Sequence, residues 1–223
     1  MIGTISLTPV MTDNSLRFVL SWESSPKDLD IHALFQLSRM QKCEVYFAKK
    51  DCVGVTLDVD NLDGGTNGVE TITINTLGNY IYTITVNKYV DNSNGVAPGE
   101  NNVNEDNNTP YKSPNVWANI PLYQSKAKVS VYAPGFSDPI KIISVPIIVD
   151  DTTVYGVMET NNPESYDWWI VFCFDGSEGI DSIVTVNKFK FSKPTLKDCS
   201  NIITEQRSRA FSSSQSTITF VRR

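Results

Sequence analysis

Residues 70–86 read ETITINTLGNYIYTITV, and this stretch decides the fold class. Leu77-Gly78-Asn79 has the composition of a tight turn. On each side of it lies a run in which β-branched or aromatic residues alternate with others. Successive side chains of a strand point to opposite faces, so each run can bury one face and expose the other. The stretch therefore predicts two short β-strands joined by a turn.

Runs of the same kind recur along the chain, separated by Gly, Pro, Asn and Asp, at residues 2–10, 16–22, 43–47, 53–57, 116–120, 127–132, 140–149, 168–174 and 183–189. The best helical candidate is 31–40, but strands on both sides of it favour an extended segment. Many short strands at regular spacing, with no repeat of fixed period, predict an all-β sandwich rather than βαβ units, a solenoid or a propeller.

Two segments break the strand pattern. Residues 91–114 contain mostly Asn, Gly, Glu and Pro, which predicts a long polar loop insertion. From Asn201 onward the chain is polar and Ser-rich, and we expect an irregular C-terminal tail over 193–223, although 217–221 alternates like an edge strand. We therefore expect one sandwich domain over 1–192, followed by the tail.

Composition and charge limit the function classes. Hydrophobic residues make up 40% of the 223 residues, enough to bury a core. The net charge of -6 argues against binding to duplex nucleic acid, which requires an excess of Lys and Arg. No run of about 18 apolar residues predicts a membrane span. Residues 1–7 lack the pattern of a secretory signal, so we expect a cytoplasmic protein, with an extracellular location left open if Met1 is not the native start.

The chain contains four cysteines, Cys43, Cys52, Cys173 and Cys199. An even number permits disulfides, and Cys43 and Cys52 could face each other across a hairpin. A chain with an adequate core does not require such cross-links, so we expect free thiols. A zinc site is excluded by the absence of a C-x-x-C spacing and by the single histidine, His32.

The first half of the chain resembles a known family. The runs LRFVLSWESSPKDLDIH, CEVYF, LDVDNLDGG, VETITI and GNYIYTITVNKY are similar to the YfaP-type, DUF2135-like family of Ig-like β domains. The resemblance covers residues 15–90 well and 125–190 loosely. It departs from the family at 64–69, where Gly-x-Gly-Pro is usual, and in the longer loop after Val90. The resemblance implies an Ig-like antiparallel β-sandwich, and it leaves function open because fold does not determine function.

Acidic residues gather at two turns of the predicted sandwich, and the candidates for a metal site are Asp28, Asp30, Asp58, Asp60, Asp63 and Glu70. A hard cation such as Ca²⁺ binds six to eight oxygens, including carboxylates that converge from different turns. The favoured alternative is that these residues bond to nearby backbone amides and shape the turns. Because His32 is the only histidine, we expect a structural role for it rather than catalysis.

The parts of an enzyme are missing from the sequence. A Ser or Cys nucleophile would have only His32 as its base, and no glycine loop of the phosphate-binding type is present. The leading hypothesis is a non-enzymatic structural or interaction module that docks into a larger protein assembly, such as a cytoskeletal or filamentous one. The alternative is a calcium-dependent binding or adhesion domain, and a carboxylate hydrolase is a distant third.

A few further residues are candidates for contacts with partners or for the core. Trp117 follows the polar loop and is the best candidate for an exposed contact, together with Arg207 and Arg209 of the tail. Trp168 and Trp169 are adjacent in a predicted strand, so alternation should bury one of them and turn the other outward.

Overall fold

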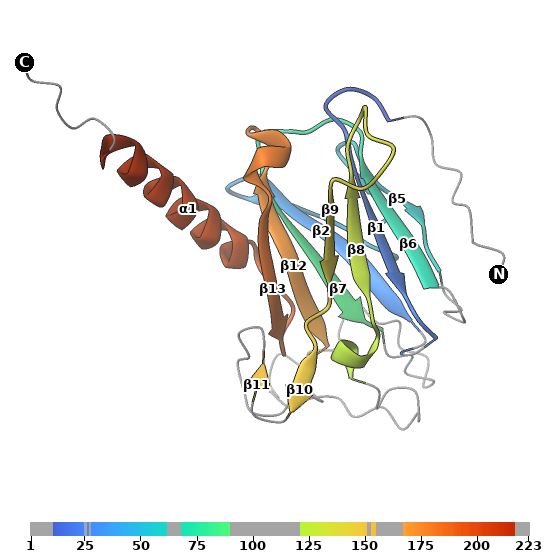
Figure 1. The fold of residues 1–223 in the computed structure, drawn as a ribbon. Helices are drawn as coiled ribbons and strands as arrows, with labels where there is room; N and C mark the ends of the chain where they lie inside the picture. Colours follow the sequence, from blue (N-terminus) through green and yellow to red (C-terminus); the bar gives the residue numbers. More distant parts are fainter. Residues whose placement is uncertain are drawn as a thin grey trace, which may run out of the picture.

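The computed structural model describes residues 11–24, 26, 28–61, 68–89, 121–150, 153–154 and 167–216. Two antiparallel β-sheets pack face to face within these residues (Figure 1). This arrangement confirms the all-β sandwich that the alternating runs predict. The expected strands at 2–10 and 116–120, the polar loop at 91–114 and the edge strand at 217–221 lie outside the described residues.

The first sheet has six strands in the order β4-β5-β6-β1-β8-β9. Their bounds are β1 Leu16–Trp22, β4 Asp51–Cys52, β5 Val55–Val59, β6 Gly68–Ile74, β8 Lys128–Tyr132 and β9 Lys141–Ser144. The second sheet has five strands in the order β13-β12-β7-β2-β3. Their bounds are β2 Leu29–Ser38, β3 Gln41–Val45, β7 Ile81–Lys88, β12 Trp168–Asp175 and β13 Val184–Lys190.

The connection between β6 and β7 carries the chain from one sheet to the other. The two strands follow each other in sequence, yet β6 pairs with β1 and β5, whereas β7 pairs with β2 and β12. The segment 31–40 is extended, as expected, and most of it belongs to β2. The single run expected at 140–149 is two strands, β9 and β10 (Ile148–Asp150), because Pro146 between them has no amide to donate to a ladder. Strand β10 pairs with β11 (Thr153–Val154) in a separate two-stranded sheet.

The core lies between the two sheets and is formed by the inward side chains of each strand. Phe18 of β1 meets Phe172 of β12 edge to face, with ring centroids 5.2 Å apart, so the central strands of both sheets contribute to it. Trp169 is fully buried, whereas Trp168 is partly exposed, as the alternation predicts. The Trp169 indole N–H donates to Asn187 Oδ1 at 2.8 Å, so its polar group is satisfied inside the protein.

The expectation of an irregular C-terminal tail is wrong for residues 196–216, which form the helix α1, Leu196–Ser216. Thr195 precedes the helix and its backbone amide donates to Asp198 Oδ2 at 2.7 Å, as in a capping box. Cys199 and Ile203 are buried against the outer face of the five-stranded sheet. Figure 1 shows that α1 leaves the side of β12 and β13 and extends away from the sandwich. The polar, Ser-rich composition of this segment does not predict a helix.

The expectation of free thiols is also wrong, because Cys43 is bonded to Cys52 and Cys173 to Cys199. The Cα atoms of the two pairs lie 6.2 and 5.5 Å apart. The first disulfide joins β3 to β4, and the second joins β12 to α1. Both disulfides attach elements at the edge of the sandwich or outside it. The size of the core therefore does not indicate whether they are present.

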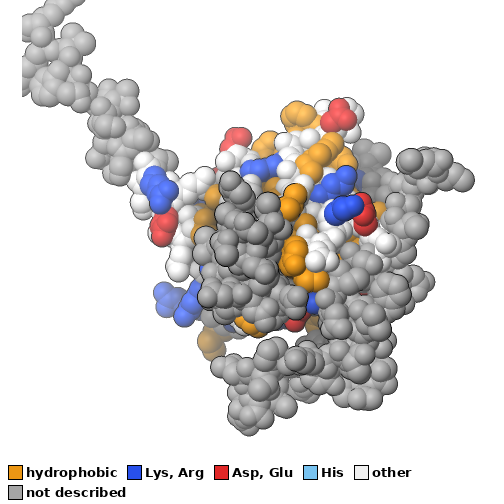
Figure 2. Space-filling view, turned by 60° about the horizontal axis from the view of Figure 1, so that its bottom comes forward, with side chains coloured by type: hydrophobic (Ala, Val, Ile, Leu, Met, Phe, Trp, Pro, Cys, Tyr) orange, Lys and Arg blue, Asp and Glu red, His pale blue; other side chains and the backbone are white. Residues whose placement is uncertain are grey.

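The described surface carries charges of both signs. Figure 2 shows, on one face, hydrophobic side chains lying between scattered Lys, Arg, Asp and Glu side chains. Among the described residues, no helix is both long and apolar enough to cross a lipid bilayer.

Candidate metal centre

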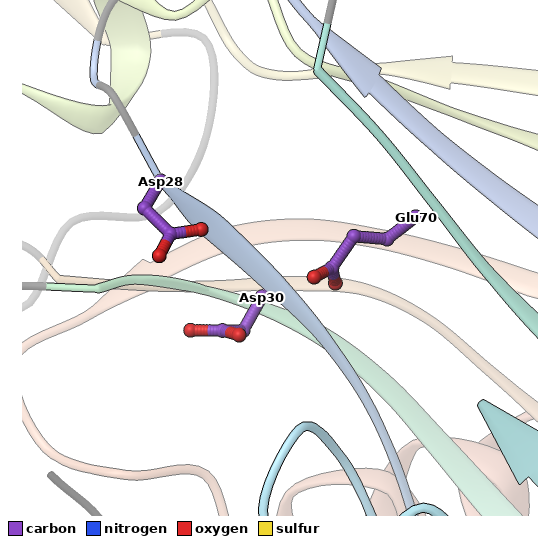
Figure 3. Close-up of side chains that lie close together, drawn as sticks. All are labelled: Asp28, Asp30 and Glu70. Carbon is purple, nitrogen blue, oxygen red and sulfur yellow. The ribbon is translucent and has the colours of Figure 1, made fainter. Parts of the chain in front are cut away.

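Three carboxylates meet where the two sheets approach each other near the start of β2. Asp28 lies just before β2, Asp30 lies within it, and Glu70 lies in β6 of the opposite sheet. One carboxylate oxygen from each residue lies within 4.8 Å of the others. Figure 3 shows Glu70 reaching from β6 toward the two aspartates of the β2 segment. The structure thus brings together three of the six acidic residues that the sequence suggests.

A gap in strand pairing explains how Glu70 reaches β2. Strand β2 pairs with β7 from Leu29, but its pairing with β3 begins only at Ala33. The backbone N–H of Ile31 lies in this gap and donates to Glu70 Oε2 at 2.7 Å. Glu70 alternates with Ile72 and Ile74 along β6, so it shares their inward direction. One side chain therefore connects the two sheets at this point.

Glu70 and Asp30 are buried, and each has one carboxylate oxygen without a described donor. Glu70 is 0% exposed and Asp30 is 3% exposed. Within the part of the chain that the structure describes, Glu70 Oε1 and Asp30 Oδ2 have no hydrogen-bond partner. A buried carboxylate that is neither paired nor fully hydrogen-bonded costs folding free energy, so such a group requires a proton or a cation.

The pKa values of both carboxyl groups respond to this environment. Burial, followed by the charge of Asp30, raises the pKa of Glu70 to about 10, even though the Ile31 amide favours the ionised form. Burial and the charges of Asp28 and Asp60 raise the pKa of Asp30 well above its ordinary range. Without a cation, Glu70 therefore retains a proton at neutral pH, and a bound cation would replace that proton.

The other acidic candidates lie in three different situations. Asp60 follows β5 beside Glu70, because Val59 pairs with Thr71 of β6, and the charge of Asp60 contributes to the raised pKa of both Asp30 and Glu70. Asp58 is engaged elsewhere, since it accepts hydrogen bonds from the hydroxyls of Thr56, at 2.8 Å, and Thr73. Asp63 lies outside the described residues. The described acidic candidates therefore do not form one group.

His32 belongs to a separate group of contacts on the outer face of the five-stranded sheet. Its Nδ1 lies 2.8 Å from Glu44 Oε1, and its ring stacks on Tyr46 with centroids 5.1 Å apart. Glu44 also pairs with Lys193 at 2.8 Å, so the segment before α1 is tied to β3. Burial lowers the pKa of His32, while Glu44 acts in the opposite direction. These contacts support the structural role expected for His32.

The residues proposed as partner contacts differ in whether they already form ion pairs within the chain. Arg207 pairs with Asp175 and with Glu178, the latter at 2.8 Å, so it holds α1 against the end of β12. Arg209 is exposed and lies 3.8 Å from Glu205 one helical turn earlier. Trp117 lies outside the described residues.

Sequence reasoning missed Lys50, whose Nζ lies 2.7 Å from Asp60 Oδ2. The β4–β5 hairpin brings these residues together, and no sequence pattern marks a pair ten positions apart across a two-residue strand.

None of the family models, curated proteins or solved structures with which the chain was compared matches it. The resemblance to the DUF2135-like family therefore stays a prediction.

Proposed function

We propose that the protein is a non-enzymatic β-sandwich binding module that requires a divalent cation, with Ca²⁺ as the ion that the site favours. The carrying observation is the set of three clustered carboxylates whose oxygens lie within 4.8 Å of one another. Two oxygens bound to one Ca²⁺ at 2.3–2.6 Å are at most about 5 Å apart, so the cluster fits one coordination sphere. The ligands are all oxygens, which suits a hard cation.

The cation would act mainly by joining the two sheets. Asp28 and Asp30 come from the β2 segment and Glu70 from β6, so a shared ion would bridge strands that do not hydrogen-bond to each other in a ladder. Its charge would also offset the repulsion among the acids. Binding to the folded state alone stabilises that state by mass action. The ion would thereby order this edge of the sandwich for partner binding.

The compartment that suits this proposal is an oxidising one. Disulfides persist outside the cytosol, where thiols are not kept reduced, and the described residues contain two of them. Extracellular modules bind Ca²⁺ with dissociation constants of roughly 10⁻⁴–10⁻³ M. A calcium-dependent binding or adhesion domain fits these conditions better than the cytoplasmic location expected from the sequence.

A second proposal is docking into a larger protein assembly, which the sequence favours. It is supported by large hydrophobic side chains that the sandwich leaves exposed, namely Met40, Val53, Phe136, Ile142 and Ile147. The two proposals are compatible, because a cation-stabilised sandwich can present such side chains to a partner. If the protein no longer captures its partner after calcium is chelated, partner binding depends on the cation site. If capture persists in chelator, partner binding is independent of that site.

Thermal unfolding with millimolar Ca²⁺, Mg²⁺ or a chelator tests the cation site. At a hundred times the dissociation constant, a ligand stabilises the folded state by about 2.7 kcal/mol. For a chain of this size that corresponds to a rise in Tm of roughly 5–10 °C. We expect Asp30→Asn and Glu70→Gln to abolish the rise. The matched control is Asp58→Asn, an acidic residue with other partners, and it should keep the rise. A wild-type protein with no calcium response would end the proposal.

A further inference from the structure

The carboxylate of Asp60 has two oxygens in different environments. Its Oδ2 lies 2.7 Å from Lys50 Nζ, in an ion pair whose side chains are 55% exposed for Lys50 and 11% for Asp60. Its Oδ1 is buried and has no hydrogen-bond partner among the described residues. Asp60 is not one of the three clustered carboxylates, but it follows Val59, which pairs with Thr71 of β6, so it lies beside Glu70 on the neighbouring strand. One oxygen of Asp60 is therefore paired with Lys50, and the other has no partner within the described part of the chain.

We propose that Asp60 is a fourth protein ligand of the cation and that the Lys50 ammonium competes with the cation for this carboxylate. Lys50 would then set the calcium affinity of the site, because its ion pair with Asp60 Oδ2 opposes the binding of a second cation to the same carboxylate. This inference rests on the proposed function, because it requires that Asp28, Asp30 and Glu70 bind a cation.

Local structure allows the Lys50 side chain to move away from Asp60 while the Lys50 backbone stays in place. The Lys50 backbone is held, since its carbonyl accepts a hydrogen bond from the Leu57 amide at 2.8 Å. The disulfide between Cys43 and Cys52 ties β4, which follows Lys50, to β3. The Lys50 side chain is more than half exposed, so its ammonium can move into water at little cost. Asp60 would then turn from the ammonium to the ion without a change in the fold.

The competition also indicates the class of cation. Lys50 already supplies one positive charge beside the carboxylates, so a monovalent ion brings no more charge than it displaces. A divalent ion brings one additional charge, which the four acids can use. We therefore expect binding of Ca²⁺ and negligible binding of Na⁺ or K⁺.

Calcium titration by isothermal calorimetry tests the competition, with the full chain and four variants. Removal of a unit charge about 4 Å from a ligand changes the interaction by about 1 kcal/mol in water-like surroundings, so Lys50→Met should tighten calcium binding roughly fivefold. Asp60→Asn should weaken it by roughly tenfold, because one charged ligand is lost. In the double variant, the effect of Lys50→Met should disappear. The matched control is Lys49→Met, a neighbouring exposed lysine, which should change the affinity by less than about twofold.

The outcomes separate this inference from the proposed function. If the wild-type protein does not bind calcium, both fail. If it binds calcium but Lys50→Met behaves like Lys49→Met, the cation site stands and the competition is refuted. The competition is likewise refuted if Lys50→Met tightens binding equally with and without Asp60. Circular dichroism verifies the fold of each variant, and Lys50→Gln gives the same readout if Lys50→Met does not fold.

Discussion

Glu70 and Asp175 are both buried carboxylates in strands of this sandwich, but their surroundings are opposite. Asp175 is 6% exposed, accepts a hydrogen bond from the Ser177 amide at 2.8 Å and pairs with Arg207. Among the described residues, Glu70 has one hydrogen bond, its second oxygen has no partner, and the charges that act on it are those of other acids. Burial alone therefore does not mark a metal ligand. What distinguishes Glu70 from Asp175 is that no described positive charge pairs with it.

The region around α1 contains a second acid that has a positive partner and a hydrogen-bond donor within the chain. Asp198 lies 2.8 Å from Lys190 Nζ and accepts a hydrogen bond from the Thr195 amide. Burial opposes ionisation of Asp198, but the hydrogen bonds from Lys190 and Thr195 outweigh it and hold the pKa below its ordinary value. Asp175 and Asp198 thus each have a positive partner, whereas Glu70 has none within the described part of the chain.

Loss of the α1 disulfide should have the largest effect and should spare the metal site. The bond joins residues 26 positions apart, which corresponds to about 3–4 kcal/mol in the chain-entropy model. Cys173→Ala combined with Cys199→Ala should lower the free energy of unfolding by that amount in urea titrations. The calcium-induced stabilisation should be unchanged. If the calcium response vanished together with the disulfide, the two regions would have to be treated as one coupled unit.

Asp175→Asn should be the next largest effect, because it removes a buried charge from a satisfied set of partners. We expect a loss of about 1–3 kcal/mol in the free energy of unfolding. Glu178→Gln is the control, since Glu178 contacts the same Arg207 from an exposed position, and it should cost less than about 1 kcal/mol. Equal losses for the two variants would show that burial of Asp175 adds nothing to its pairing.

Asp30→Asn should have the opposite sign in chelator. A carboxyl group at this position is either charged beside Asp28 and Asp60 or protonated at a cost in free energy, and an amide avoids both costs. We expect the free energy of unfolding to stay constant or to rise by about 1 kcal/mol. A loss as large as that of Asp175→Asn would mean that Asp30 has stabilising partners, and the contrast between the two regions would be wrong.

The last test of the contrast is a pH dependence that calcium removes. The unfolded chain ionises Glu70 near its ordinary pKa of 4.5, whereas the metal-free folded protein retains the proton up to about 10. The folded state binds more protons in this window, so the stability from this group is complete below pH 4.5 and declines as pH rises toward 10.

Measurements of Tm between about pH 7 and 9 isolate this effect, because His32, whose pKa is lowered from 6.5, stays neutral there. In chelator, Tm should fall as the pH rises through this window. With Glu70→Gln or with saturating calcium, the slope should become smaller. An unchanged slope in Glu70→Gln would assign the pH dependence to other groups.

Local pattern predicted the strands well and their partners poorly. The alternation in residues 70–86 identified β6 and β7, but a turn between two runs does not reveal that the strands enter different sheets. The acidic candidates were visible in sequence, whereas the convergence of Asp28, Asp30 and Glu70 depends on the pairing gap at Ile31. The start of α1 had a signal in Thr195 and Asp198, which the Ser-rich composition outweighed.

The bond between Cys173 and Cys199 also has a consequence for proteolysis. The two cysteines flank the whole segment from the end of β12 through β13 to the first turn of α1. A protease that cuts the exposed stretch at Ser192 or Lys193 would break the chain without releasing the helix. The two fragments would migrate as one species in gel electrophoresis until a reductant is added. Detachment of α1 therefore requires two chemical events, the hydrolysis of a peptide bond and the reduction of a disulfide.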